Sequence, residues 1–237
     1  MPDSYTYPGT DVLINLPGYT ERAVWKEAET AQIGVRTTAL MENPLPGSFD
    51  LRHLQAIHAY LVQGFYSWGG QLRTTDTGPG GTGIAHCRPE FIVAEATRIF
   101  AALADQDWLR DRDSDAFSRG LAWTWGELTV VHPFRDVNTR SQFAFFNQLA
   151  AEAGWLIDWT RIDSHLFGYA RTVAIFADER GIDALLHPAL EPIVLDSRAK
   201  QQRMQESAWV FSSPGRPRSR ADLDRELHEA IERRSAS

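Results

Sequence analysis

Apolar residues recur at three- and four-residue steps along most of the chain, a spacing that predicts α-helices rather than strands. One helix is expected over residues 20–42, because the segment 44–47 that follows holds two prolines and a glycine, which stop a helix. A second helix is expected from an N-cap at Asp50 to about Gln63. Its apolar face would consist of Leu51, Leu54, Ile57, His58 and Leu61.

Three further helices are expected in the middle of the chain. Residues 90–104 form the first, and a second runs from an N-cap at Ser114 into His132-Pro133, where proline bars its continuation. The third begins near Asn138 and stops at Gly154. The buried stripes of these last two helices would be formed by Phe117, Leu121, Trp125 and Leu128, and by Phe143, Phe146, Leu149, Ala150 and Ala153.

Two regions interrupt the helical pattern. The first 19 residues are rich in Pro, Gly and Tyr and predict an irregular arm. Residues 71–86 change from a threonine-rich stretch to a glycine-rich tip at 78–83 and back again, which is typical of a hairpin. The sequence therefore predicts a mainly α fold, a helical bundle with one small β-hairpin flap.

The C-terminal part is expected to be less tightly organised. Residues 162–188 should add one or two helices, and residues 212–217 read as a linker. A polar helix is expected over residues 219–234, with few apolar positions. We expect this tail to be loosely attached or bound to a partner.

Composition narrows the class of protein. The chain has 237 residues, of which 43% are hydrophobic and 23% are charged, as in soluble globular proteins. No stretch approaches 18 consecutive apolar residues and no signal peptide is seen, so we expect a cytoplasmic protein without a membrane segment. Cys87 is the one cysteine, which excludes an internal disulfide and a cysteine-rich zinc site.

Charge is unevenly placed along the chain. Residues 197–237 hold 9 Lys+Arg and 6 Asp+Glu, which leaves 15 and 25 of the totals of 24 and 31 for residues 1–196. Residues 1–196 therefore carry an excess of negative charge, which repels the phosphate backbone of nucleic acids. We expect no direct binding of nucleic acid.

The most informative segment is the junction 132–140, where a helix ends and another begins. The start of the second helix offers unpaired N–H groups that bind phosphate. Asp136 could hold Mg²⁺ against that phosphate, and His132 could accept a proton from an attacking hydroxyl. Those features predict phosphoryl or nucleotidyl transfer. The alternative is that His-Pro is an ordinary helix stop, Asp136 an ordinary cap and Arg140 a surface charge.

The same junction resembles the signature of the Fic family, HPFx[D/E]GNGRxxR. It matches at His132, Pro133, Phe134, Asp136, Asn138 and Arg140. The resemblance runs from about Tyr7 to about Leu186, and residues 147–155 and 157–159 are similar to the toxin-like branch that is inhibited by a separate small antitoxin protein. It implies a division into an N-terminal arm and helix (1–48), a Fic core (49–190) and a C-terminal extension (191–237).

The resemblance implies transfer of AMP from ATP to a protein hydroxyl. His132 would be the general base, and Phe134 would anchor the loop in the core. Asp136 would coordinate Mg²⁺, while Asn138, Thr139 and Arg140 would hold the nucleotide phosphates. The protein partner would be a target with a Ser, Thr or Tyr hydroxyl.

The flap would bind that target by pairing main chain to main chain, as an added strand. The flap positions implied in target binding are Arg73, Thr74, Thr75, Asp76 and Ile84.

Three positions depart from the signature. Val137 and Thr139 replace both glycines, and Phe143 replaces the last arginine, which in the family contacts the terminal phosphate. Valine is β-branched and is expected to narrow the anion hole or to force a different loop path. Two alternatives therefore stay open beside AMP transfer: a kinase-like or other phosphate transfer, and a non-enzymatic scaffold that binds peptide strands.

Two looser patterns have simpler explanations. Residues 38–43 fit the family's inhibitory pattern [ST]xxxE[GN], but the end of a helix before Pro44 explains them as well. The glycines of 78–83 could suggest a phosphate cradle, yet no helix start follows them, so a hairpin tip is favoured. Cys87 is expected to be a small apolar filler.

Overall fold

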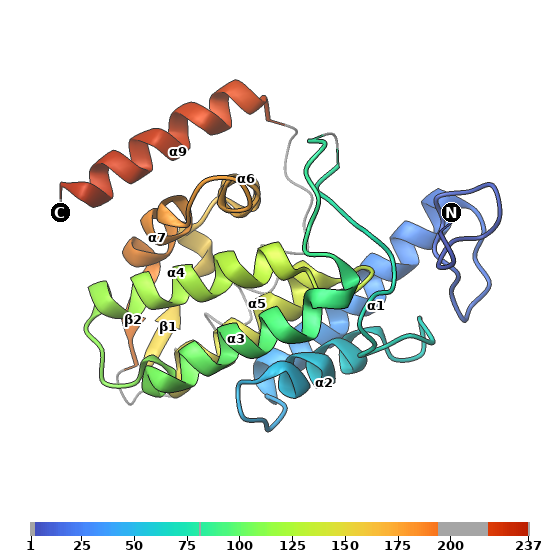
Figure 1. Cartoon of the computed structure of the whole chain (residues 1–237), viewed down its shortest axis with the longest axis horizontal. Helices are drawn as coiled ribbons and strands as arrows, with labels where there is room; N and C mark the ends of the chain where they lie inside the picture. Colours follow the sequence, from blue (N-terminus) through green and yellow to red (C-terminus); the bar gives the residue numbers. More distant parts are fainter. Residues whose placement is uncertain (1–2, 81, 194–217, 237) are drawn as a thin grey trace.

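The computed structural model describes residues 3–80, 82–193 and 218–236, in which α-helices pack in layers around a central helix (Figure 1). Helix α5 has this central place, because most of its residues are buried on every side. The helices are α1 (Arg22–Glu42), α2 (Leu51–Val62), α3 (Ile92–Asp105), α4 (Ser114–Val131), α5 (Asn138–Glu152), α6 (Ser164–Ala174), α7 (Arg180–Leu186) and α9 (Arg220–Ser235). Every predicted helix is thus confirmed to within a few residues.

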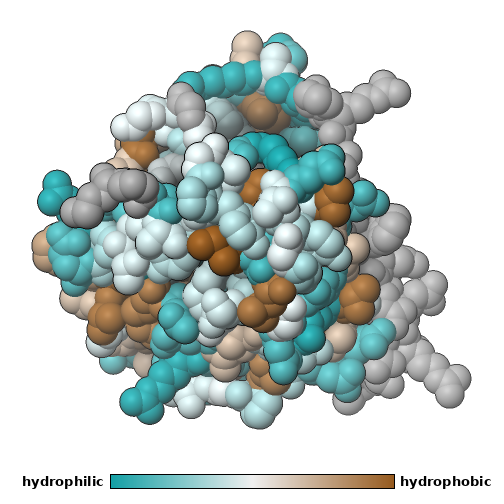
Figure 2. Space-filling view, turned by 90° about the vertical axis from the view of Figure 1, so that its right-hand side faces the viewer, coloured by the Kyte–Doolittle hydropathy of each residue, from teal (hydrophilic) through white to brown (hydrophobic). Residues whose placement is uncertain are grey.

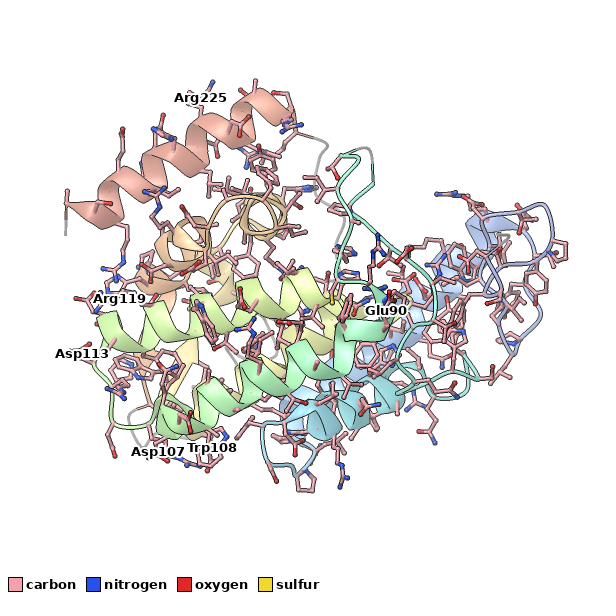
Figure 3. The ribbon with its side chains drawn as sticks, viewed as in Figure 1. Glu90, Asp107, Trp108, Asp113, Arg119 and Arg225 are labelled. Carbon is pink, nitrogen blue, oxygen red and sulfur yellow. The ribbon has the colours of Figure 1, made fainter. Side chains whose placement is uncertain are left out.

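Local capping explains where two of these helices begin. The Asp50 carboxylate accepts the His53 N–H at 2.8 Å and starts α2, as expected. The predicted cap at Ser114 is wrong by one residue, because Asp113 is extended and its carboxylate accepts the Ala116 N–H at 2.8 Å. Asp113 lies at the start of α4 (Figure 3), and Ser114 is the first helical residue.

Aromatic side chains fill the space around α5. Trp125 of α4 stacks on Phe146 with ring centroids 4.4 Å apart, and Phe143 contacts Trp159 at 4.9 Å. Helix α1 belongs to the same core, since Trp25 and Ile33 are buried in it. Aromatic burial of this kind is worth roughly 1.5–3 kcal/mol for each large side chain, so the packing fixes the position of α5 and of the loop before it.

The regular strands do not lie in the flap. Strands β1 (Trp155–Ile157) and β2 (Leu190–Pro192) pair antiparallel, with Leu156 opposite Glu191. Residues 71–80 and 82–86 form no strand in the part described, where one main-chain bond links the Thr77 carbonyl to the His86 N–H at 2.9 Å. The flap is therefore two arms that are held at their base, rather than a regularly paired hairpin.

The N-terminal arm is irregular, as expected. One isolated bridge pairs Thr6 with Leu13, and the side chains of Val12 and Leu13 are buried. Figure 2 shows the face of the molecule on this side, where apolar side chains form separate spots among polar ones.

The expectation of a loosely attached tail is wrong for residues 220–235. Helix α9 packs on α6 and α7 (Figure 1), and Leu227 is 4% exposed. Arg234 donates to Asp183 at 2.9 Å, and a side chain at Gly181 would collide with Leu227. The large apolar side chains of α9, those of Leu223, Leu227 and Ile231, pack against the bundle. They are few, so the sequence of this segment is polar overall although the helix docks. The linker predicted at 212–217 lies outside the described residues.

No helix within the described ranges combines the length and the apolar character needed to cross a membrane.

Candidate active site

The loop between α4 and α5 is bounded by two residues in the left-handed conformation. His132 ends α4 with φ 45° and ψ 64°, and Val137 precedes α5 with φ 61° and ψ 14°. Proline at 133 cannot continue the helix, so the chain must leave α4 at this point. The loop therefore places His132 next to the first turn of α5.

Asn138 and Phe134 hold this loop in shape. The Asn138 side chain accepts the Phe134 N–H at 2.9 Å and donates to the Phe134 carbonyl at 2.8 Å. The Phe134 ring is fully buried and stacks on His58, with centroids 3.8 Å apart. Both ends of the Asn138 amide are thus engaged within the loop, so any phosphate contact at this residue would fall to its backbone N–H.

His132 is a neutral imidazole that is partly exposed, with its Nδ1 side turned into the protein. Burial is the main reason that its pKa lies well below the ordinary value, and the nearby His86, Arg171 and Arg73 lower it further. Its Nδ1 atom is buried and forms no well-oriented hydrogen bond to a described residue. The ring is therefore uncharged at neutral pH, with one nitrogen protonated and the other able to accept a proton.

His86 is a second imidazole at this site, and the sequence did not predict its role. Its ring stacks on His132 with centroids 3.8 Å apart and 7° between the planes, and its Nδ1 lies 2.9 Å from the Thr77 hydroxyl. Burial lowers the pKa of His86 to about 4. Two neutral rings therefore lie face to face, and the end of the flap fixes the orientation of the proposed base. Only the presence of a histidine at the base of the flap could have hinted at this.

Arg73 joins the flap to the loop with its side chain. Nε donates to the His132 carbonyl at 2.7 Å, and Nη1 donates to the Thr75 carbonyl at 2.7 Å. Nη2 donates to the carbonyls of Val131, at 3.2 Å, and Cys87. The side chain of Arg73 is 2% exposed, so it holds His132 in place and is not on the surface that would meet a target.

The other flap positions are more accessible. Thr74 and Asp76 are exposed, while Thr75 and Ile84 are partly exposed. The N–H groups of residues 75–77 have no hydrogen-bond acceptor among the described residues, whereas the Thr74 N–H donates to the Tyr5 hydroxyl at 3.2 Å. One arm of the flap thus presents free main-chain donors. The described residues of the glycine-rich tip, 78–80 and 82–83, do not begin a helix.

The two arms approach closely at Gly78, where a Cβ would lie 2.1 Å from the Ile84 carbonyl oxygen. We expect Gly78→Ala to push the arms apart and to weaken the bond between the His86 N–H and the Thr77 carbonyl. Losing about 1 kcal/mol there would speed amide hydrogen exchange of His86 roughly fivefold. Gly80→Ala is the matched control, since nothing lies within 4 Å of its Cβ position. Equal exchange in both variants would contradict the prediction.

A buried carboxylate from outside the loop meets the motif arginine. Glu29 of α1 is fully buried and lies 3.4 Å from Arg140, 2.6 Å from Lys26 and 2.5 Å from the Tyr66 hydroxyl. Glu29 could not be predicted from the sequence, because no local signal joins it to a residue 111 positions away. Arg140, predicted to hold phosphate, thus has a counter-charge supplied by α1.

Asp136 sits close to this carboxylate. Burial is the main reason that its pKa is raised, and Glu29 raises it further. One carboxylate oxygen accepts the Val137 N–H at 2.6 Å, which leaves the other oxygen for a ligand. A single hard oxygen donor beside a phosphate site fits Mg²⁺, which binds through one or two carboxylates and keeps several waters. In the described part of the chain no cluster of at least three His, Cys, Asp or Glu could hold a metal by itself.

The departures from the signature fit into the fold in two ways. Val137 takes the left-handed conformation that the motif's glycine allows, and it is 3% exposed within the core. Holding a β-branched residue there costs roughly 1–2 kcal/mol, which burial of the side chain in the core offsets. Phe143 is 1% exposed and takes part in the core, where it leaves no cation at that position.

The first turn of α5 has the properties of an anion site. The N–H groups of residues 138–140 have no acceptor among the described residues, and no side chain caps this helix. Unpaired amides at a helix start carry partial positive charge, so a phosphate group is a suitable ligand.

The residues of the inhibitory pattern lie far from this turn. Glu42 is the last residue of α1, about 20 Å along the helix axis from Glu29, which contacts Arg140. The Thr38 hydroxyl donates to the Gly34 carbonyl of the same helix at 3.2 Å. Their placement favours the simple explanation, a helix end before Pro44.

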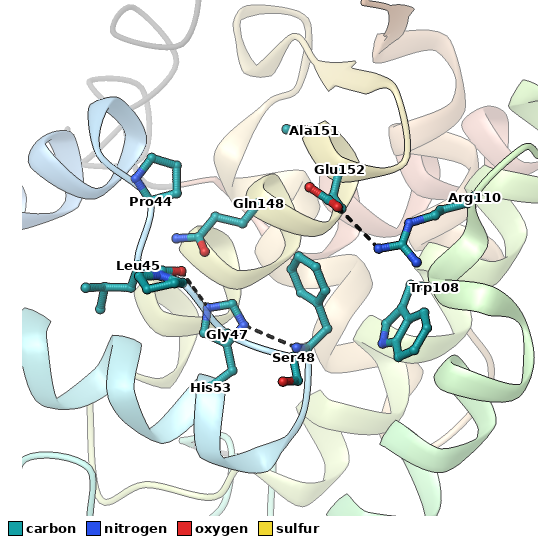
Figure 4. A pocket seen from close by; sticks show the side chains of 12 residues that line it. Pro44, Leu45, Gly47, Ser48, His53, Trp108, Arg110, Gln148, Ala151 and Glu152 are labelled. Carbon is teal, nitrogen blue, oxygen red and sulfur yellow. Dashed lines mark hydrogen bonds and ion pairs between the residues drawn. The ribbon is translucent and has the colours of Figure 1, made fainter.

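A cavity of about 500 Å³ lies elsewhere, between the segment 44–49, the start of α2 and the end of α5 (Figure 4). Gln148, one of its lining residues, is about 15 Å along α5 from Asn138. This cavity is therefore separate from the loop that carries His132.

Comparison with known proteins gives consistent matches. The profile of the Fic/DOC family matches residues 48–150. The chain is 34% identical over 166 residues to "Probable protein adenylyltransferase y4lH" of Sinorhizobium fredii, covering 70% of this chain and 84% of that protein. It is 33% identical over 196 residues to "Protein adenylyltransferase VbhT" of Bartonella schoenbuchensis, covering 83% of this chain but 41% of that longer protein.

Solved structures show the same fold. The N-terminal Fic domain of a Bep effector from Bartonella quintana, with bound ADP, has a TM-score of 0.74 at 23% identity and covers 79% of this chain and 94% of that one. BepC of Bartonella tribocorum, with bound AMPPNP, has a TM-score of 0.74 at 22% identity and covers 80% of this chain and 97% of that one. The helical fold is therefore shared with these domains.

Proposed function

This chain belongs to the Fic/DOC family, and we propose that it is a protein adenylyltransferase, which moves AMP from ATP to a hydroxyl side chain of a target protein. The observation that carries the proposal is the neutral imidazole of His132 beside the unpaired amides that begin α5. A proton acceptor and an anion site lie next to each other, as transfer of a phosphate-linked group requires.

The proposed reaction uses residues of the loop in order. The amides of residues 138–140 bind the phosphates of ATP and place the α-phosphorus near His132. Because Nδ1 is buried, Nε2 of His132 takes the proton of the target hydroxyl. The hydroxyl oxygen then bonds to the α-phosphorus, and the bond from that phosphorus to the bridging oxygen breaks, so pyrophosphate leaves.

Mg²⁺ is the cofactor we assign to Asp136. When bound, the ion would neutralise charge on the phosphates as the displacement develops. Asp136 suits this role because its second carboxylate oxygen, on the loop that leads into α5, has no partner in the loop. Burial raises the pKa of this carboxyl, and a bound cation would favour its ionised form.

The target would dock on the flap. The free N–H groups of residues 75–77 could donate hydrogen bonds to an extended peptide, which would lie along the flap as an added strand. A Ser, Thr or Tyr hydroxyl of that peptide would reach His132. A small antitoxin protein is a further proposed partner, from the resemblance of residues 147–159 to the toxin-like branch. We place the activity in the cytoplasm, where ATP is available.

Two labelled forms of ATP test the reaction. The full chain is mixed with Mg²⁺, a bacterial protein extract and ATP labelled at the α- or the γ-phosphate, and labelled proteins are separated on a gel. We expect label from the α-position on protein. Label from the γ-position would indicate the kinase-like alternative instead, and label from neither would leave a scaffold that binds peptide.

A further inference from the structure

Arg171 of α6 carries a buried positive charge, and no carboxylate of residues 3–80, 82–193 or 218–236 pairs with it. It is 6% exposed, and its side chain donates to Thr129 Oγ1 at 3.3 Å, Thr139 Oγ1 at 2.9 Å and Gln142 Oε1 at 2.9 Å. No Asp or Glu among the described residues forms an ion pair with it. Burial lowers its pKa to about 10, which leaves the group charged at neutral pH.

Such a charge is costly unless something negative comes close. Neutral oxygens satisfy the hydrogen bonds of Arg171 but do not cancel its charge. Its field reaches the reacting loop, because Arg171 is among the charges that lower the pKa of both His132 and His86. An anion bound at the start of α5 would supply the missing counter-charge.

Thr139 connects Arg171 to that anion site. It lies in the first turn of α5, where it is exposed, and its Oγ1 accepts an N–H of Arg171. No group in the described ranges receives the hydroxyl hydrogen of Thr139. A hydroxyl whose oxygen accepts from a guanidinium is a stronger and better oriented donor, as in other charge-assisted hydrogen bonds.

We propose that the Thr139 hydroxyl donates a hydrogen bond to a phosphate oxygen of the bound nucleotide, and that Arg171 is the positioning residue that orients and polarises it. The inference rests on the proposed function, since it takes ATP as the ligand. In this arrangement Arg171 supplies a positive charge near the nucleotide phosphates. The motif's last arginine cannot do so here, because position 143 is a buried phenylalanine.

Nucleotide binding by the full chain tests the role of Thr139. Calorimetry with Mg²⁺ and ATP should show about tenfold weaker binding for Thr139→Val, and near wild-type binding for Thr139→Ser, which keeps the hydroxyl. Adenosine should bind both variants like the wild type, because it lacks phosphate. The matched control is Thr97→Val, which removes an exposed hydroxyl on α3 that bonds the Val93 carbonyl. A change in adenosine binding would show a structural effect and would contradict the proposal.

A double variant tests the coupling of the two residues. In an Arg171→Met background, Thr139→Val should cause no further loss of ATP affinity, because the hydroxyl has already lost its orientation. Additive losses would overturn the role of Arg171. Should Arg171→Met fail to melt cooperatively, Arg171→Lys takes its place, and full ATP affinity in that variant would mean that the charge alone is enough and the orienting contact is dispensable.

The outcomes separate this inference from the proposed function. If the wild type binds ATP and transfers label from its α-phosphate, while Thr139→Val binds ATP equally well, the inference fails and the function stands. If the wild type does not bind ATP at millimolar concentration, both fail together.

Discussion

Replacing His132 by alanine is expected to reduce transfer of AMP roughly 10²–10⁴-fold, the range that a positioned general base supplies. Its ring is neutral because burial and nearby cations lower its pKa, so it is ready to take a proton from the target hydroxyl. The measurement is the rate at which α-labelled ATP labels protein. The affinity for ATP should stay within about threefold of wild type, because the imidazole acts on the hydroxyl and not on the phosphates.

Two controls make this result specific. His228→Ala changes a histidine on the exposed face of α9, with a side chain 79% exposed, and should leave transfer unchanged. His132→Ala itself should melt cooperatively, so that lost activity is not lost fold. Transfer that survives in His132→Ala would mean that another group is the base.

Acid should unfold the protein over a narrow range of pH. Burial lowers the pKa of His58 to about 3 and that of His86 to about 4, while both would titrate near 6.5 in the unfolded chain. The folded state therefore keeps these rings neutral where the unfolded state binds protons. Their contribution to stability is complete above pH 6.5 and falls as the pH drops toward the folded values. At pH 4 the loss is about 3 kcal/mol for each ring, out of a typical total of 5–15 kcal/mol.

Urea unfolding between pH 7.5 and 4 measures this loss. The free energy of unfolding should fall by about 1.4 kcal/mol per pH unit for each such histidine. Asp136 works in the opposite direction, because its raised pKa favours the folded state in acid, but it is a single group. His86→Phe should lower the slope of the free energy of unfolding against pH by up to about 1.4 kcal/mol per pH unit, the contribution of one proton. His228→Gln, at an exposed site, should not change this slope. A flat profile above pH 4 would contradict the prediction.

Local patterns were sufficient to predict the helices. The spacing of apolar residues, the cap at Asp50 and the stop at Pro133 each act within one or two turns of the chain, so the sequence carries them directly. The error at Ser114 has the same origin, since Asp113 and Ser114 are both good caps and only the backbone decides between them. The docking of α9 was missed because its buried side depends on the surface of α7.

The partners of the motif could not be predicted from local patterns. The stacking of His86 on His132 and the ion pair of Glu29 with Arg140 join residues far apart in the chain. Such contacts depend on the packing of whole helices, and a single sequence does not encode them at a fixed spacing. Val137 shows the reverse case, in which local propensity argued against a conformation that the core then imposes.

The contact between Glu29 and Arg140 bears on how the protein should be cloned for experiments. A fragment trimmed to the family-matched range 48–150 would lack α1, and with it the carboxylate that faces the motif arginine and the core side chain of Ile33. It would also end before α6 and so omit Arg171. If that fragment showed no activity, the cause could be its truncated core. The full chain of 237 residues should therefore be used to test whether the loop is catalytically competent.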